Sequence, residues 1–293
     1  MQQFKAELAF QIESTLGESP MWHPEQQKLY WVDIEKMELH NFHPATKDHS
    51  MVPTKKRIGS VVPANNGNLI LALQGEIAEM DLSTYATKKL IDIEPGLPMN
   101  RCNDAKCDKQ GRLWVGTMDM DCKPGKGSLY CIDATLKITA ALQNLTISNG
   151  MGWSLTGDKM YFIDSAEHCV KCFDFNIDHP KLSNQKVVVK SRTDKELPDG
   201  MCIDSEGMLW VAFWGGARVG RYNPQTGEQL AHIEVPALNV TSCCFGGIDL
   251  KTLYITTARE GLSEQKLFKY PLSGSLFSST VEAGGSVVGY FKR

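Results

Sequence analysis

The feature that most constrains the fold of this chain is a short apolar strand motif that returns six times. It reads KLYWVD, NLILAL, RLWVGT, KMYFID, MLWVAF and TLYITT, and the second residues of successive copies are 40, 44, 47, 49 and 44 positions apart. Such a period is typical of four-stranded propeller blades. Turn residues precede each copy, and most copies are followed by another short strand. We therefore expect an all-β, six-bladed β-propeller that takes residues 1–293 as a single domain and is closed by an N-terminal strand.

The composition favours a small or uncharged ligand over a macromolecule. The formal net charge of the 293 residues is only -3, which offers no basic field for nucleic acid or for anionic lipid. The first residues, MQQFKAELAFQIEST, do not resemble a secretory signal, and no run is long enough for a membrane span. We expect no nucleic-acid partner, no membrane association, and a monomer or weak homodimer.

Cysteine usage indicates a reducing compartment. There are nine cysteines, an odd number scattered through a chain that is too long to need disulfide staples. Cys169 and Cys172 lack a second cysteine pair that would complete a zinc site, and Cys243 and Cys244 would point to opposite faces of a strand. We expect structural free thiols and a cytoplasmic protein.

One polar position recurs before the apolar motif. Counting back 10 or 11 residues from the second residue of each motif reaches Glu18, Asn103, Asn149 and Asp199 in four blades, and Ile58 or Gly59 and Ser242 or Cys243 in the other two. Acidic residues and asparagines together are 46 of 293 residues, about one in six, so four in six is an excess. These residues could simply cap turns. Alternatively they form a ring in the central channel, which the first strand of each blade lines.

Three members of this ring suit a metal ion. Glu18, Asn149 and Asp199 would supply two carboxylates and one amide oxygen, a set of hard ligands that fits calcium, magnesium or manganese. Zinc usually takes some histidine or cysteine as well. Three protein ligands leave coordination positions open, as catalytic ions require.

Arg101 and Asn103 open the third blade on the same rim. Arginine presents a planar fork of donors and asparagine both donates and accepts, so the pair suits a hydroxyl-rich ligand. An arginine in a loop can also be merely solvated, and the pattern alone leaves both interpretations open.

Five motifs, in order, resemble those of the regucalcin and gluconolactonase family of sugar lactonases. They are GESPMW with LYWVDI, RCNDAKCDKQGRLWVGTM, SNGMGWSLTGDKMYFIDS, LPDGMCIDSEGMLWVA and TSCCFGG. The resemblance spans nearly the whole chain. It implies a six-bladed propeller with one divalent cation (calcium, zinc, magnesium or manganese) at the top of the channel, which hydrolyses aldonolactones to aldonic acids. It also implies that Glu18, Asn149 and Asp199 bind the metal and that Arg101 and Asn103 contact the sugar lactone.

The chain departs from this family after WVGTM. Family members that are similar to regucalcin carry a longer loop with two glutamates, whereas this chain has a shorter DMDCKPGKG segment. We therefore expect Asp121 to accept a hydrogen bond from a sugar hydroxyl, and the substrate preference to differ.

The implied chemistry is hydrolysis by metal-activated water. The cation would polarise the lactone carbonyl and lower the pKa of the water, and Asp199 could also take the proton of that water. Two other classes of function stay open: calcium binding or regulation without catalysis, and hydrolysis of other lactones or organophosphates on the same scaffold. A propeller that only binds other proteins would have no use for the acidic ring.

Overall fold

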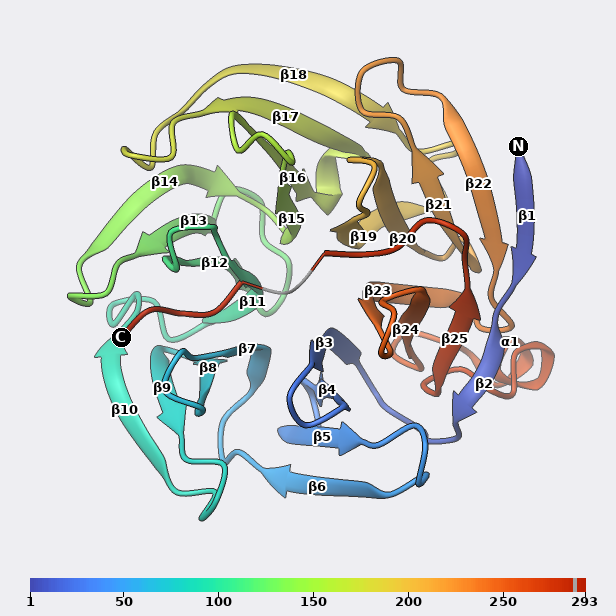
Figure 1. Ribbon diagram of the computed structural model, residues 1–293, viewed down its shortest axis with the longest axis horizontal. Coiled ribbons are helices and arrows are strands. Elements are labelled where there is room, and N and C mark those ends of the chain that lie inside the picture. The colour runs from blue at the N-terminus through green and yellow to red at the C-terminus, as the bar shows by residue number, and fades with distance from the viewer. Residues whose placement is uncertain (287–288) are drawn as a thin grey trace.

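The strands form six sheets around a central channel (Figure 1). The computed structural model describes residues 1–286 and 289–293. Four antiparallel strands make up each sheet, from an innermost strand at the channel to an outer strand at the rim, and one sheet gains a fifth, parallel strand. The six-bladed propeller predicted from the repeat is therefore confirmed.

The blades follow one another along the chain. Blades one and two are β3 (Gly17–His23), β4 (Lys28–Asp33), β5 (Glu38–Phe42), β6 (His49–Pro53) and β7 (Ile58–Pro63), β8 (Leu69–Leu73), β9 (Glu76–Met80), β10 (Thr87–Asp92). Blades three and four are β11 (Asn100–Cys107), β12 (Leu113–Asp119), β13 (Gly127–Ile132), β14 (Ile138–Leu145) and β15 (Ser148–Trp153), β16 (Lys159–Asp164), β17 (Cys169–Phe175), β18 (Leu182–Lys190). Blades five and six are β19 (Leu197–Ile203), β20 (Leu209–Trp214), β21 (Arg218–Tyr222), β22 (Gln229–Glu234) and β23 (Asn239–Gly246), β24 (Thr252–Ala258), β25 (Leu276–Thr280).

The N-terminus closes the ring, as predicted. Strand β2 (Glu7–Phe10) pairs antiparallel with β25 and supplies the fourth strand of blade six. Strand β1 (Gln2–Lys5) continues onto blade five, where it pairs parallel with β22. The two ends of the chain of blades are thus joined by backbone hydrogen bonds (Figure 1). Closure leaves no open edge between blades six and one.

The recurring apolar motif is the second strand of every blade. Side chains on both faces of these strands are buried, because each blade packs against its two neighbours. Burial on both faces explains why the motif is a continuous apolar run rather than an alternating one. Trp31, Trp114 and Trp210 are almost completely buried here. Each large side chain buried in this way contributes about 2–3 kcal/mol.

Two buried aspartates hold the first hairpins of blades three and five. Asp204 accepts hydrogen bonds from two turn N–H groups, from Trp210 Nε1 at 3.0 Å and from Arg221 Nε at 2.7 Å. Asp108 repeats this arrangement with Trp114 and with an arginine of its own hairpin. One carboxylate therefore satisfies the turn, the core tryptophan and a buried guanidinium together.

Little of the described chain is helical. A short helix, α1 (Glu264–Lys269), which the sequence analysis did not predict, lies in the connection between β24 and β25, and one 3-10 turn, η1, spans Ser165–Glu167. Neither is long or apolar enough to cross a bilayer, and no other helix occurs in residues 1–286 and 289–293.

All nine cysteines are free thiols, as predicted. Cys243 and Cys244 are neighbours on β23 but pack into different core clusters. The sulfur of Cys243 lies 3.7 Å from that of Cys202. Seven of the nine are buried core side chains, whereas Cys202 is partly buried and Cys122 is exposed.

We expect Asp204→Ala to lower the free energy of unfolding by roughly 3–5 kcal/mol, because it leaves Nε of buried Arg221 and Nε1 of buried Trp210 without an acceptor. Urea unfolding followed by circular dichroism would measure the change. Asp81→Ala is the matched control, since Asp81 caps a similar turn but is only partly buried and binds no arginine among the described residues. Equal stabilities for both variants would contradict a structural role for Asp204.

Candidate metal centre and active site

The ladder of hydrogen bonds is irregular at one height in all six innermost strands. The register shifts between Glu18 and Met21, Ile58 and Ser60, Cys102 and Ala105, Ser148 and Met151, Pro198 and Met201, and Val240 and Ser242. Such bulges bend a strand and turn a side chain away from the regular alternation. The structure thereby brings Glu18, Asn103, Asn149 and Asp199 together on one cavity of about 320 Å³.

The glycines that follow two of these residues are required by close approach of the innermost strands. A Cβ on Gly150 would lie 2.6 Å from the carbonyl oxygen of Asp199, and one on Gly200 would lie 2.0 Å from the hydroxyl of Ser242. No larger residue fits without moving backbone. The recurring Asn-Gly and Asp-Gly pairs therefore combine one polar side chain with one position of tight packing between blades.

Asn149 is held with its amide oxygen free. Its Nδ2 donates to the hydroxyl of Ser165 at 3.0 Å, and that hydroxyl donates to the carbonyl of Pro198 at 2.6 Å. The Oδ1 atom is buried and has no hydrogen-bond partner among the described residues. A buried amide oxygen without a donor is costly unless a ligand completes it.

The carboxyl group of Asp199 has the same deficit, and the carboxyl group of Glu18 is buried beside it. Glu18 Oε2 accepts the N–H of Ser19 at 2.7 Å, whereas Asp199 Oδ1 is buried without a partner in the described part of the chain. Burial, and then the charge of Asp104, raises the pKa of Glu18 to about 8. Burial, and then the charge of Glu18, raises the pKa of Asp199 well above its usual range.

These observations fit a divalent cation. Two buried carboxylates and a free amide oxygen are hard donors, and a cation among them would supply the counter-charge that both carboxyls lack. In residues 1–286 and 289–293 no three His, Cys, Asp or Glu side chains cluster as metal ligands. A cation at this point of the channel would therefore depend on Asn149 as well as on the two acids.

Arg101 lines the same cavity beside the proposed ligands. Its Nη1 donates to Asn103 Oδ1 at 2.5 Å and to the carbonyl of Cys102 at 3.1 Å. Asn103 in turn donates from Nδ2 to the carbonyl of Ser148 at 2.7 Å. Asn103 thus positions the guanidinium group of Arg101, and the hydrogen bonds found for that group in the described residues all come from Nη1.

Asp121 is not brought into this cavity. Its side chain is 60% exposed and lies 2.9 Å from the ammonium group of Lys123. Asp121 does not line the cavity, although Met118, Met120 and Cys122 of the same segment do. The expected contact of Asp121 with a sugar hydroxyl stays a prediction.

The sequence analysis missed a second set of cavity residues. Glu35, Met120, Ser165, Trp214 and Glu260 all line the cavity. Each lies at the end of the second strand of its blade or just after it, five to seven residues after the second position of the apolar motif. Their offsets differ and their residue types share no one chemistry, so no recurring polar position indicated them. The functional rim thus combines the starts of innermost strands with the loops that leave the second strands.

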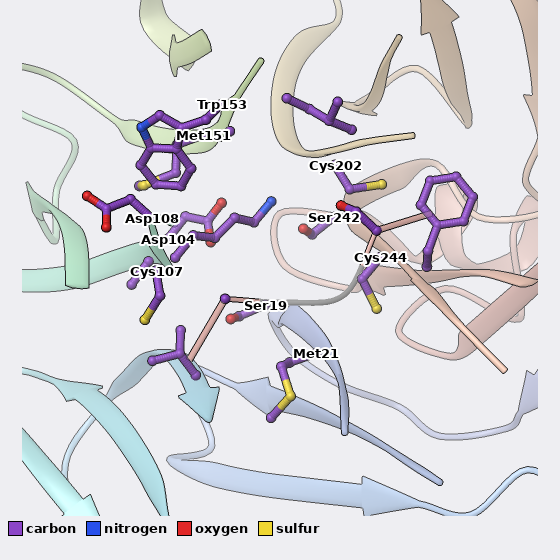
Figure 2. Close-up of a pocket in the computed structure, with 18 of the residues that line it drawn as sticks. Ser19, Met21, Asp104, Cys107, Asp108, Met151, Trp153, Cys202, Ser242 and Cys244 are labelled. Atoms are coloured by element: carbon purple, nitrogen blue, oxygen red, sulfur yellow. The ribbon is translucent and has the colours of Figure 1, made fainter. Parts of the chain in front are cut away.

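A second cavity of about 310 Å³ lies farther along the same innermost strands (Figure 2). Its wall is mostly apolar and sulfur-rich, with Met151, Trp153, Cys202 and Cys244 among the lining residues. Its charged lining residues include Lys106 and Lys109 beside Asp104 and Asp108, so carboxylates and ammonium groups are present in equal number. Asp104 lines it, and one buried oxygen of this carboxylate has no partner among the described residues.

C-terminal residues cross the propeller at this second end. Gly285 bridges to Asp204, and Phe291 bridges to Ala64 (Figure 1). The first cavity, with its polar donors, is therefore the candidate active site.

Comparison with known proteins agrees with this site. The family described as SMP-30/Gluconolactonase/LRE-like region matches residues 16–259. Regucalcin from Danio rerio is 37% identical over 282 residues, 96% of this chain and 95% of that protein. The provisionally named sugar lactone lactonase YvrE from Bacillus subtilis is 36% identical over 272 residues, 93% of each chain. The crystal structure of regucalcin from Agrobacterium tumefaciens, described as a calcium-binding protein, superposes with a TM-score of 0.95 at 26% identity and covers 100% of this chain and 99% of that one.

We expect the metal-free protein to lose stability as the pH rises from about 5 to about 8. Glu18 has a pKa of about 8 when folded and 4.5 as the ordinary value, so the folded state binds more protons in this window. Stability must then fall with rising pH. Thermal unfolding in the presence of a chelator would show a falling midpoint, and the fall should be smaller in Glu18→Gln. A midpoint with the same pH dependence in both proteins would contradict the raised pKa.

Proposed function

Because the chain belongs to the SMP-30/gluconolactonase/LRE-like family, we propose that it is a divalent-metal-dependent hydrolase that opens sugar lactones to aldonic acids. The observation that carries the proposal is the buried set of Glu18, Asn149 and Asp199, in which one oxygen of Asn149 and one of Asp199 have no hydrogen-bond partner among the described residues. The name of the Bacillus subtilis relative, a sugar lactone lactonase, supports the substrate class.

Glu18, Asn149 and Asp199 would hold the cation. When bound, the cation supplies Lewis acidity for the lactone carbonyl and a lower pKa for the attacking water. Asp199 has an oxygen without a hydrogen-bond partner in the described residues, so we assign it to accept the proton of that water. Ser165 keeps Asn149 oriented, which keeps its amide oxygen in the ligand set.

Arg101 would orient the lactone. Its side chain is buried and is fixed by Asn103, so few rotamers remain to be ordered when a ligand binds. The free N–H groups can donate to the hydroxyls or the ring oxygen of a lactone. The ring oxygen leaves as a new hydroxyl when the acyl bond breaks, and the product is an aldonic acid.

The competing proposal is calcium binding without catalysis. The Agrobacterium tumefaciens relative is described as a calcium-binding protein, and the same three donors would serve. Three protein ligands predict weak binding compared with dedicated calcium sites. The two proposals differ in turnover, which the following experiment measures.

We expect metal-stripped protein to be inactive on glucono-δ-lactone and to regain activity when refilled with calcium, magnesium, manganese or zinc. Asp199→Ala should lower kcat by about a hundredfold or more, because it removes a ligand and the proton acceptor. Asp92→Ala, on the outer strand β10, is the control and should retain full activity. An ion that binds without turnover of any lactone would favour the calcium-binding alternative.

We expect Glu18→Ala and Arg101→Ala to lower activity for different reasons. The first should lose metal affinity in isothermal titration calorimetry, because one of two carboxylate donors is gone. The second should keep the metal and raise KM by about tenfold, with kcat little changed, because a charged hydrogen bond to the substrate is lost. Equal loss of metal in both variants would show that Arg101 supports the centre rather than the substrate.

A further inference from the structure

We propose that Glu35 and Glu260 form an acidic wall of the active-site cavity that selects uncharged, hydroxyl-bearing lactones and rejects phosphorylated ones. This inference rests on the proposed lactonase function and names the substrate class within it. Glu35 follows β4 of blade one, and Glu260 follows β24 of blade six. Both line the cavity together with Glu18, Arg101 and Asp199.

Glu35 is a fixed, charged acceptor. Its carboxylate receives Arg57 Nε at 3.0 and 3.1 Å and Arg57 Nη2 at 2.8 Å, a two-pronged ion pair. The hydrogen bond from Arg57 lowers the pKa of Glu35. Such a pair is geometrically defined, and carboxylate oxygens retain further lone pairs for hydroxyl donors. Glu35 can therefore accept a substrate hydroxyl without moving.

Glu260 has a fixed backbone and a free side chain. Its N–H donates to the carbonyl of Thr15 at 2.9 Å, and its carbonyl accepts Asn239 Nδ2 at 2.9 Å. No hydrogen bond or ion pair is formed by its carboxyl group within the described residues. A carboxyl group that is held at a cavity wall with all its acceptors free is suited to hydroxyl groups.

The acidic wall changes which ligands Arg101 attracts. A single arginine in a cavity ordinarily suggests a site for phosphate or carboxylate. Here Glu35 and Glu260 line the same cavity as Arg101, and their charges act on its guanidinium group more strongly than that of Glu18 does. They weaken the attraction of Arg101 for an added phosphate group.

The charges around the cavity lead to the same conclusion. Four carboxyl groups line the cavity, those of Glu18, Asp199, Glu35 and Glu260, together with the guanidinium group of Arg101, and Arg57 binds Glu35 from outside the lining. With all four carboxyl groups ionised, this set carries a net charge of about -2. One divalent cation brings this set to neutrality. A neutral lactone enters such a site without an electrostatic penalty, whereas a substrate with a phosphate group adds two uncompensated negative charges.

The same electrostatic argument applies to release of the product. Hydrolysis adds water across the acyl carbon–oxygen bond, the ring oxygen takes a proton as the new hydroxyl, and the carboxylic acid loses its proton at neutral pH. The substrate is neutral and the product is an anion. The acidic wall therefore binds the product less well than the substrate and favours its departure.

The experiment compares glucono-δ-lactone with its 6-phosphate ester in metal-loaded protein. We expect kcat/KM to favour the uncharged lactone by about a hundredfold, which corresponds to about 2.7 kcal/mol. Glu260→Gln and Glu35→Gln should each reduce this preference by about tenfold, chiefly through a lower KM for the phosphate ester. A preference that is unchanged in both variants, or a wild type that prefers the phosphate ester, would overturn the proposal.

The matched control is Glu264→Gln. This exposed residue lies on α1, four positions after Glu260, and does not line the cavity. Its loss removes the same charge from the same segment, and the preference should not change. A change equal to that of Glu260→Gln would show a general effect of net charge and would also overturn the acidic wall.

Binding separates this inference from the proposed function. Gluconate and 6-phosphogluconate can be titrated calorimetrically into metal-loaded wild type and Glu260→Gln, whether or not any lactone is hydrolysed. We expect the variant to bind 6-phosphogluconate about tenfold more tightly than the wild type does. Equal affinities would overturn the acidic wall, even in a protein that proves to be an active lactonase.

Discussion

The constraint on which the rest of the structure depends is the burial of two carboxyl groups, Glu18 and Asp199, beside each other on the channel axis. Burial and mutual repulsion both raise the pKa of Asp199, so the pair is unstable as two bare anions. Only a rigid surrounding frame can hold such groups together. The closed ring, in which β2 joins blade six to the start of the chain, provides that frame.

The second strand of each blade stabilises the fold, whereas the innermost strand supplies the polar side chains of the candidate site. The second strand of each blade is buried on both faces and contributes apolar packing, as Trp114 and Trp210 illustrate. The innermost strand contributes one side chain at a bulge, such as Asn149, and a glycine beside it that permits close packing. The site can therefore contain unpaired buried oxygens while the packed blades stabilise the fold.

The sequence predicts the features that repeat and misses those that do not. The period of the apolar motif predicts six blades, and counting back 10 or 11 residues from it finds Glu18 and Asp199, because a propeller places equivalent positions at one height. Glu35 and Glu260 lie in loops whose lengths differ between blades, so no single offset finds them. The position of Asp121 was not predictable either, since the conformation of its loop depends on local contacts with Lys123.

The ammonium group of Lys106 lies on the side of Glu18 and Asp199 that faces the second cavity. Asp104 lies near both Glu18 and Asp199 and raises their pKa values. The charge of Lys106, two residues along the same strand, opposes the rise in the pKa of Asp104, and its ammonium group donates to the carbonyl of Met201 across the channel. The side toward the second cavity thus already holds a positive charge. A bound cation is therefore most favourable on the open side, beside Asn149 and the substrate cavity.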